Sequence, residues 1–316
     1  MKVIIRHILL NCCFLALYAQ SFVNINTTHL RLLKQKKKQF CYVSFVNVDG
    51  KKFLVKQKRN NRDLLAVVYD ALAAQIAETL DSNIAHKVII VPTFQKFPGK
   101  IYDDWPATIH TLATGATLKD KRSSYRKMNI KQASQGFRRE MIPWMACHNQ
   151  LIKIVALDIF LCNHDRHRGN LFYHAKTNSF CAIDMDLLFE HNLPLFAYQN
   201  VLRMADNDLF PLTTKEFFAL LELRKTLQLL IHEYPVEKTL ALFDRFIHES
   251  QLIEKSLFCT REISAKIDST QKMIRQSYKD TILLVKVLGD VLEKAIALKP
   301  TLRSFKMVQD FEKELR

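Results

Sequence analysis

The stretch that most constrains the fold of this chain runs from Leu157 to Phe189 and reads LDIFLCNHDRHRGNLFYHAKTNSFCAIDMDLLF. It begins as the end of an apolar, helix-like run, passes through a polar loop and closes on a strand-like segment that ends at Asp184. The loop holds Asp165 and, five residues later, Asn170. This order of a carboxylate, an amide and a second carboxylate is typical of a site for phosphate and metal ions.

The spacing of these side chains matches the demands of phosphoryl transfer. Such a site needs one carboxylate near the attacking hydroxyl and oxygen ligands for the cations on the phosphates. We therefore expect Asp165 to orient the hydroxyl, and Asn170 and Asp184 to bind Mg²⁺, or Mn²⁺, with ATP as the phosphate donor. A structural interpretation stays open, because Asp, Asn and His side chains in loops often bond their own backbone.

The segments NHDRHRGNLF and AIDMDLLF resemble the catalytic and metal-binding loops of the phosphatidylinositol 3- and 4-kinase-like superfamily, which includes the HipA-type bacterial protein kinases. The matching residues are Asn163, Asp165, Arg166, His167 and Asn170, followed by Asp184. The resemblance implies a catalytic group of Asp165, Arg166 and His167, with Asp165 as base, and a metal pair of Asn170 and Asp184. His167 has an alternative role, which is to brace the loop through backbone hydrogen bonds.

The resemblance also implies the domain organisation, which is an α+β, two-lobed protein-kinase-like fold. Residues 30–112 would form a small lobe of sheet plus helix, and residues 113–316 a mainly helical lobe. With only six Gly and eight Pro in 316 residues, the composition also favours helices. In the second lobe, Thr213 and Glu216 have the spacing of a capping box, and further helices are expected from Val236 and over Ser269–Leu298.

A β-hairpin is predicted near the start of the small lobe. Two apolar and β-branched runs, QFCYVSFVNV and KKFLVKQK, flank an Asp-Gly pair, which is a strong hairpin signal. By resemblance, Lys56 on the second strand holds the nucleotide phosphates. Lys58 is the alternative, since residues two apart share a face of a strand.

An amphipathic helix is predicted over Arg62–Leu80, where a kinase-like fold places an acidic partner for the strand lysine. No Glu occurs in its first half, so Asp70 or Asp63 is the expected partner, and Glu78 lies near the helix end. The chain also contains no glycine-rich phosphate loop, and Lys36 to Lys38 are a candidate substitute. The run ATIHTLATG resembles the strand and hinge that hold adenine, with the hinge at Thr111 to Gly115.

The net charge of +16 favours polyanionic partners. The densest basic segment covers residues 119–139 and is either a docking surface for anionic lipid or a solvated face. The resemblance implies either a phosphoinositide headgroup hydroxyl or a Ser/Thr side chain of a protein as the acceptor, and the positive charge favours the lipid. A catalytically inactive pseudokinase and a basic nucleic-acid-binding module are the rival interpretations, and no basic motif interleaved with aromatic residues supports the nucleic-acid module.

Residues 1–19 resemble a signal peptide, with a basic start, an apolar core of about a dozen residues and a small residue at Ala19. The expected location is therefore extracytoplasmic or secreted, including action inside a host cell, and cytoplasmic if this leader is not used. The scattered cysteines contain no Cys-x-x-Cys pair, which argues against both a disulfide framework and a structural zinc site.

Overall fold

The structure is a computed structural model that describes residues 31–37, 41–48, 50–58, 65–93, 96, 99–102, 105–113, 115–118, 145–163, 165–189, 212–252 and 260–315. The predicted signal peptide at 1–19 and the basic segment 119–139 lie outside these residues, as do Lys38 and Asp63.

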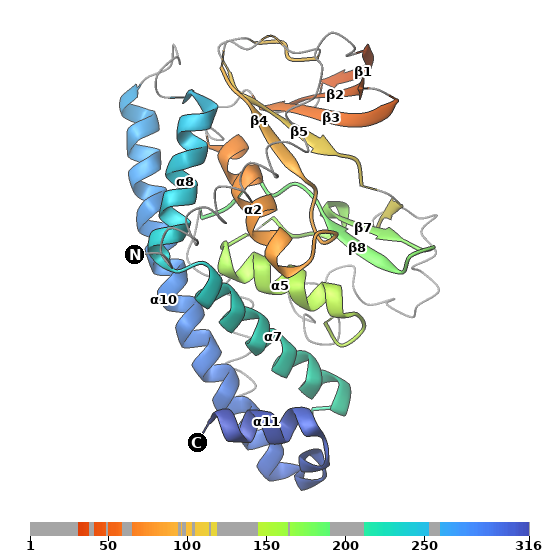
Figure 1. Cartoon of the computed structure of the whole chain (residues 1–316), viewed down its shortest axis with the longest axis vertical. Coiled ribbons are helices and arrows are strands. Elements are labelled where there is room, and N and C mark those ends of the chain that lie inside the picture. Colours follow the sequence, from red (N-terminus) through yellow and green to blue (C-terminus); the bar gives the residue numbers. More distant parts are fainter. Residues whose placement is uncertain are drawn as a thin grey trace, which may run out of the picture.

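The first lobe is built on a five-stranded antiparallel sheet with the order β1-β2-β3-β5-β4 (Figure 1). Its strands are β1 (Arg31–Lys37), β2 (Cys41–Val48), β3 (Lys51–Lys58), β4 (Val88–Val91) and β5 (Ala107–Thr111). The predicted hairpin is confirmed as β2 and β3, and Gly50 between them has a φ of 79°, a conformation that glycine adopts without steric penalty. The basic run RLLKQKK, for which no strand was predicted, forms the edge strand β1. Lysines on an edge strand disfavour pairing with other chains.

The register of the sheet gives it two different faces. Val46, Val55 and Ile109 belong to a small apolar core on one face. Lys56 lies opposite Val43 of β2 and Thr108 of β5, so these three side chains share the other face. That second face is directed toward the remainder of the molecule, because Lys56 contacts residues of the second lobe.

Helix α2 (Ala66–Leu80) joins the two lobes and begins four residues later than the sequence predicts. Most of its residues are buried, including Leu72 and Ile76, because it packs against the sheet on one side and helices on the other (Figure 1). Its hydroxyl groups also bind the helical lobe. Tyr69 bonds Thr270 at 2.7 Å between their oxygens, and Thr79 bonds the hydroxyl of Tyr234 at 2.6 Å.

The second lobe is mainly helical, as predicted. It contains α5 (Asn149–Phe160), α7 (Thr214–Glu233), α8 (Val236–Ser250), α10 (Thr260–Leu298), α11 (Lys306–Glu314) and the short 3-10 turns η4 (Arg168–Asn170) and η5 (Pro300–Ser304). A three-stranded sheet lies beside α5, with β6 (Ala116–Thr117), β7 (Leu171–His174) and β8 (Ser179–Ala182) in that order. The predicted capping box at Thr213 and Glu216 is present. One continuous helix, α10, covers the region predicted from Ser269 and starts nine residues earlier.

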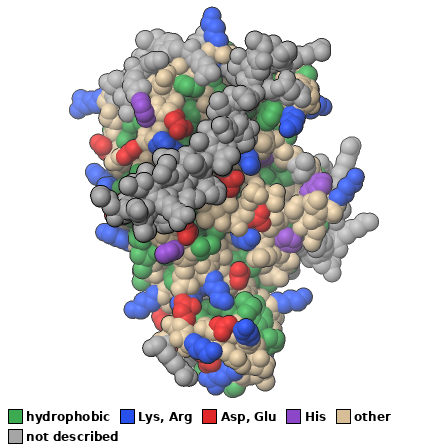
Figure 2. Space-filling model, in the orientation of Figure 1, with side chains coloured by type: hydrophobic (Ala, Val, Ile, Leu, Met, Phe, Trp, Pro, Cys, Tyr) green, Lys and Arg blue, Asp and Glu red, His purple; other side chains and the backbone are tan. Residues whose placement is uncertain are grey.

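A single apolar core extends through α2, α5, α7, α8, α10 and α11, so the two lobes share their packing. The predicted α+β class, with a sheet-plus-helix lobe and a mainly helical lobe, is therefore confirmed. On the face drawn in Figure 2, the basic and acidic side chains of the described residues are interspersed. Among the described residues, no helix combines the length and apolarity needed to cross a membrane.

Candidate active site

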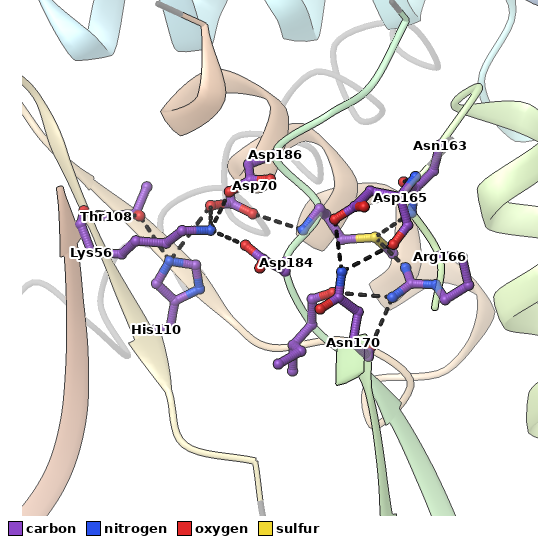
Figure 3. Close-up of polar contacts among 12 residues, drawn as sticks. Lys56, Asp70, Thr108, His110, Asn163, Asp165, Arg166, Asn170, Asp184 and Asp186 are labelled. Carbon is purple, nitrogen blue, oxygen red and sulfur yellow. Dashed lines mark hydrogen bonds and ion pairs between the residues drawn. The ribbon is translucent and has the colours of Figure 1, made fainter. Parts of the chain in front are cut away.

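Lys56 brings the two lobes together at one point. From β3 its ammonium reaches the carboxylates of Asp184 and Asp186, which follow β8 (Figure 3). Asp70 of α2 lies 3.6 Å from the same nitrogen. Three of the residues predicted from the sequence, Lys56, Asp70 and Asp184, therefore converge.

The carboxylates keep this buried lysine charged. Burial by itself lowers the pKa of the Lys56 ammonium, but Asp70, Asp186 and Asp184 outweigh it and hold the pKa well above the ordinary lysine value. The three carboxylates differ in exposure, since the side chain of Asp184 is 36% exposed while those of Asp70 and Asp186 are 4% and 2% exposed. Asp184 is therefore the one that faces a ligand entering the site.

Asp165 and Asn170 are paired in the loop between α5 and β7. The Asn170 side-chain nitrogen donates to the Asp165 carboxylate at 2.9 Å and to its backbone oxygen at 3.0 Å. Half-burial raises the pKa of the Asp165 carboxyl, the nearby His167 and the Asn170 hydrogen bond lower it, and Asp184 and Asp186 raise it further. The influence of Asp184 and Asp186 places Asp165 in the electrostatic field of the cluster around Lys56 (Figure 3).

The Arg166 side chain is directed into the protein. It is 3% exposed, and its guanidinium makes two bonds, of 2.8 and 2.9 Å, to the carboxylate of Asp158 in α5. It also donates to the backbone oxygens of Asn170 at 2.8 Å and Ile183 at 3.0 Å. These contacts make Arg166 a positioning residue that ties the loop to the strand end carrying Asp184.

Sequence reasoning missed Asp158, the partner that fixes Arg166. The sequence contains a signal for this partner, because Asp158 is an acidic residue inside the apolar run IVALDIFL. A charge buried in a helix needs a counter-charge. Asn163 completes this network, donating to Asp158 at 2.6 Å and accepting from the backbone amide of Asp165 at 3.1 Å.

His167 is exposed, and its ring nitrogen accepts a hydrogen bond from the Gly169 amide at 2.9 Å, which caps the short turn η4. This contact agrees with the bracing role that the sequence left open. A contact of His167 with a phosphate or an acceptor stays a prediction.

Met185 is a second residue that the sequence reasoning passed over. Its backbone amide donates to the Asp70 carboxylate at 3.1 Å. Its sulfur accepts from Arg166 at 2.7 Å and from Asn163 at 3.3 Å. Through these contacts, Met185 fixes the segment Asp184-Met185-Asp186 to both α2 and the loop between α5 and β7.

The predicted metal ligands fit a hard cation. Asp184 offers a half-open carboxylate, and the amide nitrogen of Asn170 is occupied by Asp165, which directs its carbonyl oxygen to the opposite side. Within the described residues, no group of three or more His, Cys, Asp or Glu side chains is arranged as a metal site. Magnesium suits the pair of Asn170 and Asp184, because this ion is commonly held by one or two carboxylates together with substrate phosphates.

The two predicted hinge residues lie at the connection between the sheets. Thr111 ends β5, and its hydroxyl accepts from the Lys87 amide at 3.1 Å. Gly115 has a φ of 98°, and a Cβ at this position would come within 2.2 Å of the Tyr173 backbone oxygen, so the approach of the chain to β7 requires glycine. Contact of either residue with a nucleotide stays a prediction.

The remaining alternatives are also placed. Glu78 pairs with Lys87 at 3.5 Å, so its carboxylate is directed away from Lys56. Lys36 is exposed and lies opposite Val43, which puts it in the same cross-strand row as Lys56 and on the same face of the sheet. Lys36 is thus available for the role of covering phosphates that the sequence suggested.

No protein-family model and no curated protein matches the chain. Similar solved structures include the proinflammatory kinase CtkA of Helicobacter pylori, at 10% identity and a TM-score of 0.46 over 85% of this chain and 96% of that one. Another is the kinase PK-1 of the Cydia pomonella granulovirus, at 14% identity and a TM-score of 0.34 over 74% and 98%. Because these TM-scores are low, the function is argued from the side chains of the site.

Proposed function

We propose that this chain is a kinase that transfers the γ-phosphate of ATP to an alcohol group with the help of Mg²⁺. The observation that carries the proposal is the convergence of Lys56, from the sheet of one lobe, with Asp184, from the other, beside the Asp165–Asn170 pair. A charged lysine, two carboxylates and an amide in this order supply the groups that phosphoryl transfer needs.

Each residue has a separate task in this proposal. Lys56 binds the phosphates as a point charge, and it is kept charged by its carboxylate neighbours. Asp165 accepts a hydrogen bond from the acceptor hydroxyl and orients its oxygen toward the γ-phosphate. Asn170 and Asp184 would hold magnesium, which neutralises charge on the phosphate oxygens when it is bound.

The same geometry implies a change when the nucleotide binds. Lys56 contacts Asp184, which is the most exposed of its three carboxylates. Phosphate oxygens that approach from the open side compete for the ammonium with this carboxylate, while Asp70 and Asp186 remain behind it. Asp184 would then be free to hold a cation.

For the acceptor we propose an anionic lipid headgroup of the phosphoinositide type. The support is the net charge of +16, together with the resemblance of the loop NHDRHRGN to the phosphatidylinositol 3- and 4-kinase-like superfamily. A Ser or Thr side chain of a protein is the alternative outcome of the test. The interspersed charges of Figure 2 mark no docking surface among the described residues on that face.

The test is incubation of the full chain with labelled ATP and Mg²⁺, with phosphoinositide vesicles in one arm and a generic protein substrate in the other. We expect label in lipid, and the Asp165→Asn variant should lose about 10²- to 10⁴-fold in turnover, as expected for a group that handles the acceptor proton. The exposed Asp290→Asn on α10 is the matched control and should keep full activity.

The other outcomes separate the rival functions. Label in protein alone would replace the lipid by a protein acceptor, while ATP binding without turnover would indicate a pseudokinase. Absence of ATP binding, alongside salt-sensitive binding to RNA or DNA, would contradict the kinase proposal and favour a nucleic-acid-binding module.

A further inference from the structure

Asp186 has no role of its own in the proposed function, although its carboxylate makes one of the closest contacts in the site. Its carboxylate accepts a hydrogen bond from the Lys56 ammonium and its side chain is 2% exposed. Asp70, the helix residue expected to pair with this lysine, stands farther away at 3.6 Å. The lysine is thus bonded to the segment after β8 more closely than to α2.

The segment Asp184-Met185-Asp186 explains why this arrangement forms. The backbone turns at Asp184, where φ is 59°, and the Asp184 and Asp186 carboxylates both reach Lys56. The Met185 sulfur contacts Arg166, while the Met185 backbone amide donates to Asp70. The carboxylate of α2 therefore holds the backbone of this segment.

We propose that Asp186 is the residue that positions Lys56 for the nucleotide phosphates, and that Asp70 acts one step back by fixing the segment that carries Asp184 and Asp186. This inference rests on the proposed kinase function and assigns the counter-ion that a kinase-like site normally takes from a helix glutamate. It gives the two acidic residues of the segment Asp184-Met185-Asp186 different roles: Asp184 would hold the cation, and Asp186 positions the lysine.

One consequence concerns the control of the site. Where a helix carboxylate holds the lysine, a displacement of that helix separates the ion pair. Here the lysine and the cation ligand are held through one three-residue segment, which is clamped by Asp70 on one side and by Arg166 on the other. The lysine and the cation ligand are therefore positioned together.

The test is a double-mutant cycle on ATP affinity measured without divalent cation, in EDTA. Asp186→Asn should weaken metal-free ATP binding by about 10- to 100-fold, since hydrogen bonds to charged groups contribute on that scale. In a Lys56→Met background the same substitution should have no further effect, because Asp186 acts through the lysine. Asp184→Asn should not weaken metal-free binding, because it removes a carboxylate that competes with phosphate for Lys56, and it should remove the gain in affinity that Mg²⁺ gives.

Two results would overturn the inference. If Asp186→Asn weakens binding equally with and without Lys56, the residue has a general structural role. If it leaves metal-free binding unchanged but raises the Mg²⁺ concentration needed for turnover, Asp186 is a cation ligand. Asp290→Asn again serves as the exposed control and should change neither quantity.

A second cycle, on the melting temperature of the nucleotide-free chain, separates this inference from the kinase proposal. Lys56→Met and Asp186→Asn should each lower the melting temperature, and the double variant should lose less than the sum of the two effects, because it removes both members of the Lys56–Asp186 ion pair. The coupling should be smaller for Lys56→Met with Asp70→Asn. Strictly additive shifts for Asp186 would contradict the inference, whereas failure of the whole chain to bind ATP would contradict only the proposed function.

Discussion

At the scale of single residues, the site depends on two buried charge clusters that share the segment from Asp184 to Asp186. Lys56 and its carboxylates form the first, and Arg166 with Asp158 forms the second. The two are connected through Met185, which contacts Arg166 by its sulfur and Asp70 by its amide. A charge removed from either cluster should therefore affect both the stability and the geometry of the site.

Asp158→Asn should destabilise the chain by about 3–5 kcal/mol, because the Arg166 charge would be left buried without its partner. The free energy of unfolding in urea measures this. The double variant Asp158→Leu with Arg166→Met should recover much of the loss but not the turnover, since the loop and Ile183 would lose their common donor. A loss below about 1 kcal/mol for Asp158→Asn, comparable to typical surface substitutions, would contradict this account.

His86, beside the Lys56 cluster, should make the fold sensitive to acid. Burial and the Lys56 charge together lower the pKa of its imidazole to about 4, against the opposing effects of a hydrogen bond with the Thr111 backbone and of the Asp184 charge. The unfolded chain binds the proton at higher pH than the folded one, so stability is full above about pH 6.5 and falls as the pH drops toward 4. His86→Gln should reduce this loss by up to about 3 kcal/mol.

Unfolding curves between pH 7 and 4 measure the effect of His86. The exposed His248→Gln is the control and should leave the pH dependence as it is. Equal pH dependence in the unchanged chain and the His86→Gln variant would show that other groups cause the acid sensitivity.

At the scale of elements, local sequence signals placed most helices and strands, and packing decided their ends. The Asp-Gly pair fixed the β2–β3 hairpin, and Thr213 with Glu216 fixed the start of α7. The basic run that became β1 was missed, because its lysines carry little strand propensity and it is ordered by pairing with β2. Likewise α10 extends further than its local pattern, since its apolar residues are shared between several partners.

The capping box of α7 provides a prediction at this scale. The Thr213 hydroxyl accepts from the Glu216 amide at 3.2 Å, and the Glu216 carboxylate accepts from the Thr213 amide at 2.9 Å. Thr213→Ala should lower the free energy of unfolding by about 1 kcal/mol without changing ATP affinity. Thr301→Ala, an exposed threonine in η5, is the control, and an equal loss in both variants would argue against a specific cap.

At the scale of the whole molecule, helix α2 belongs to the same apolar core as the helices of the second lobe. Leu72 of α2, Leu157 of α5 and Leu284 of α10 belong to the same buried cluster. The bonds of Tyr69 to Thr270 and of Thr79 to Tyr234 add polar links across the same contact. Helix α2 should therefore not unfold separately from the second lobe.

Hydrogen exchange at increasing urea tests this cooperativity. Peptides from α2 and from α10 should lose protection at the same urea concentration, because both helices belong to one continuous core. Two separate transitions, with α2 exchanging first, would contradict this common core.

The sequence by itself determined the chemistry available to this protein, because the order of Asp165, Asn170 and Asp184 and the hairpin carrying Lys56 follow from local patterns. The tertiary structure alone decided which carboxylates meet the lysine, since Lys56 and Asp186 are 130 residues apart and their contact depends on the docking of two lobes. The tertiary structure also decided that Arg166 is buried, because its partner Asp158 lies on α5 and the two side chains meet only when the loop packs against that helix. Local periodicity determines elements, whereas the pairing of buried charges depends on the surfaces that those elements bring together.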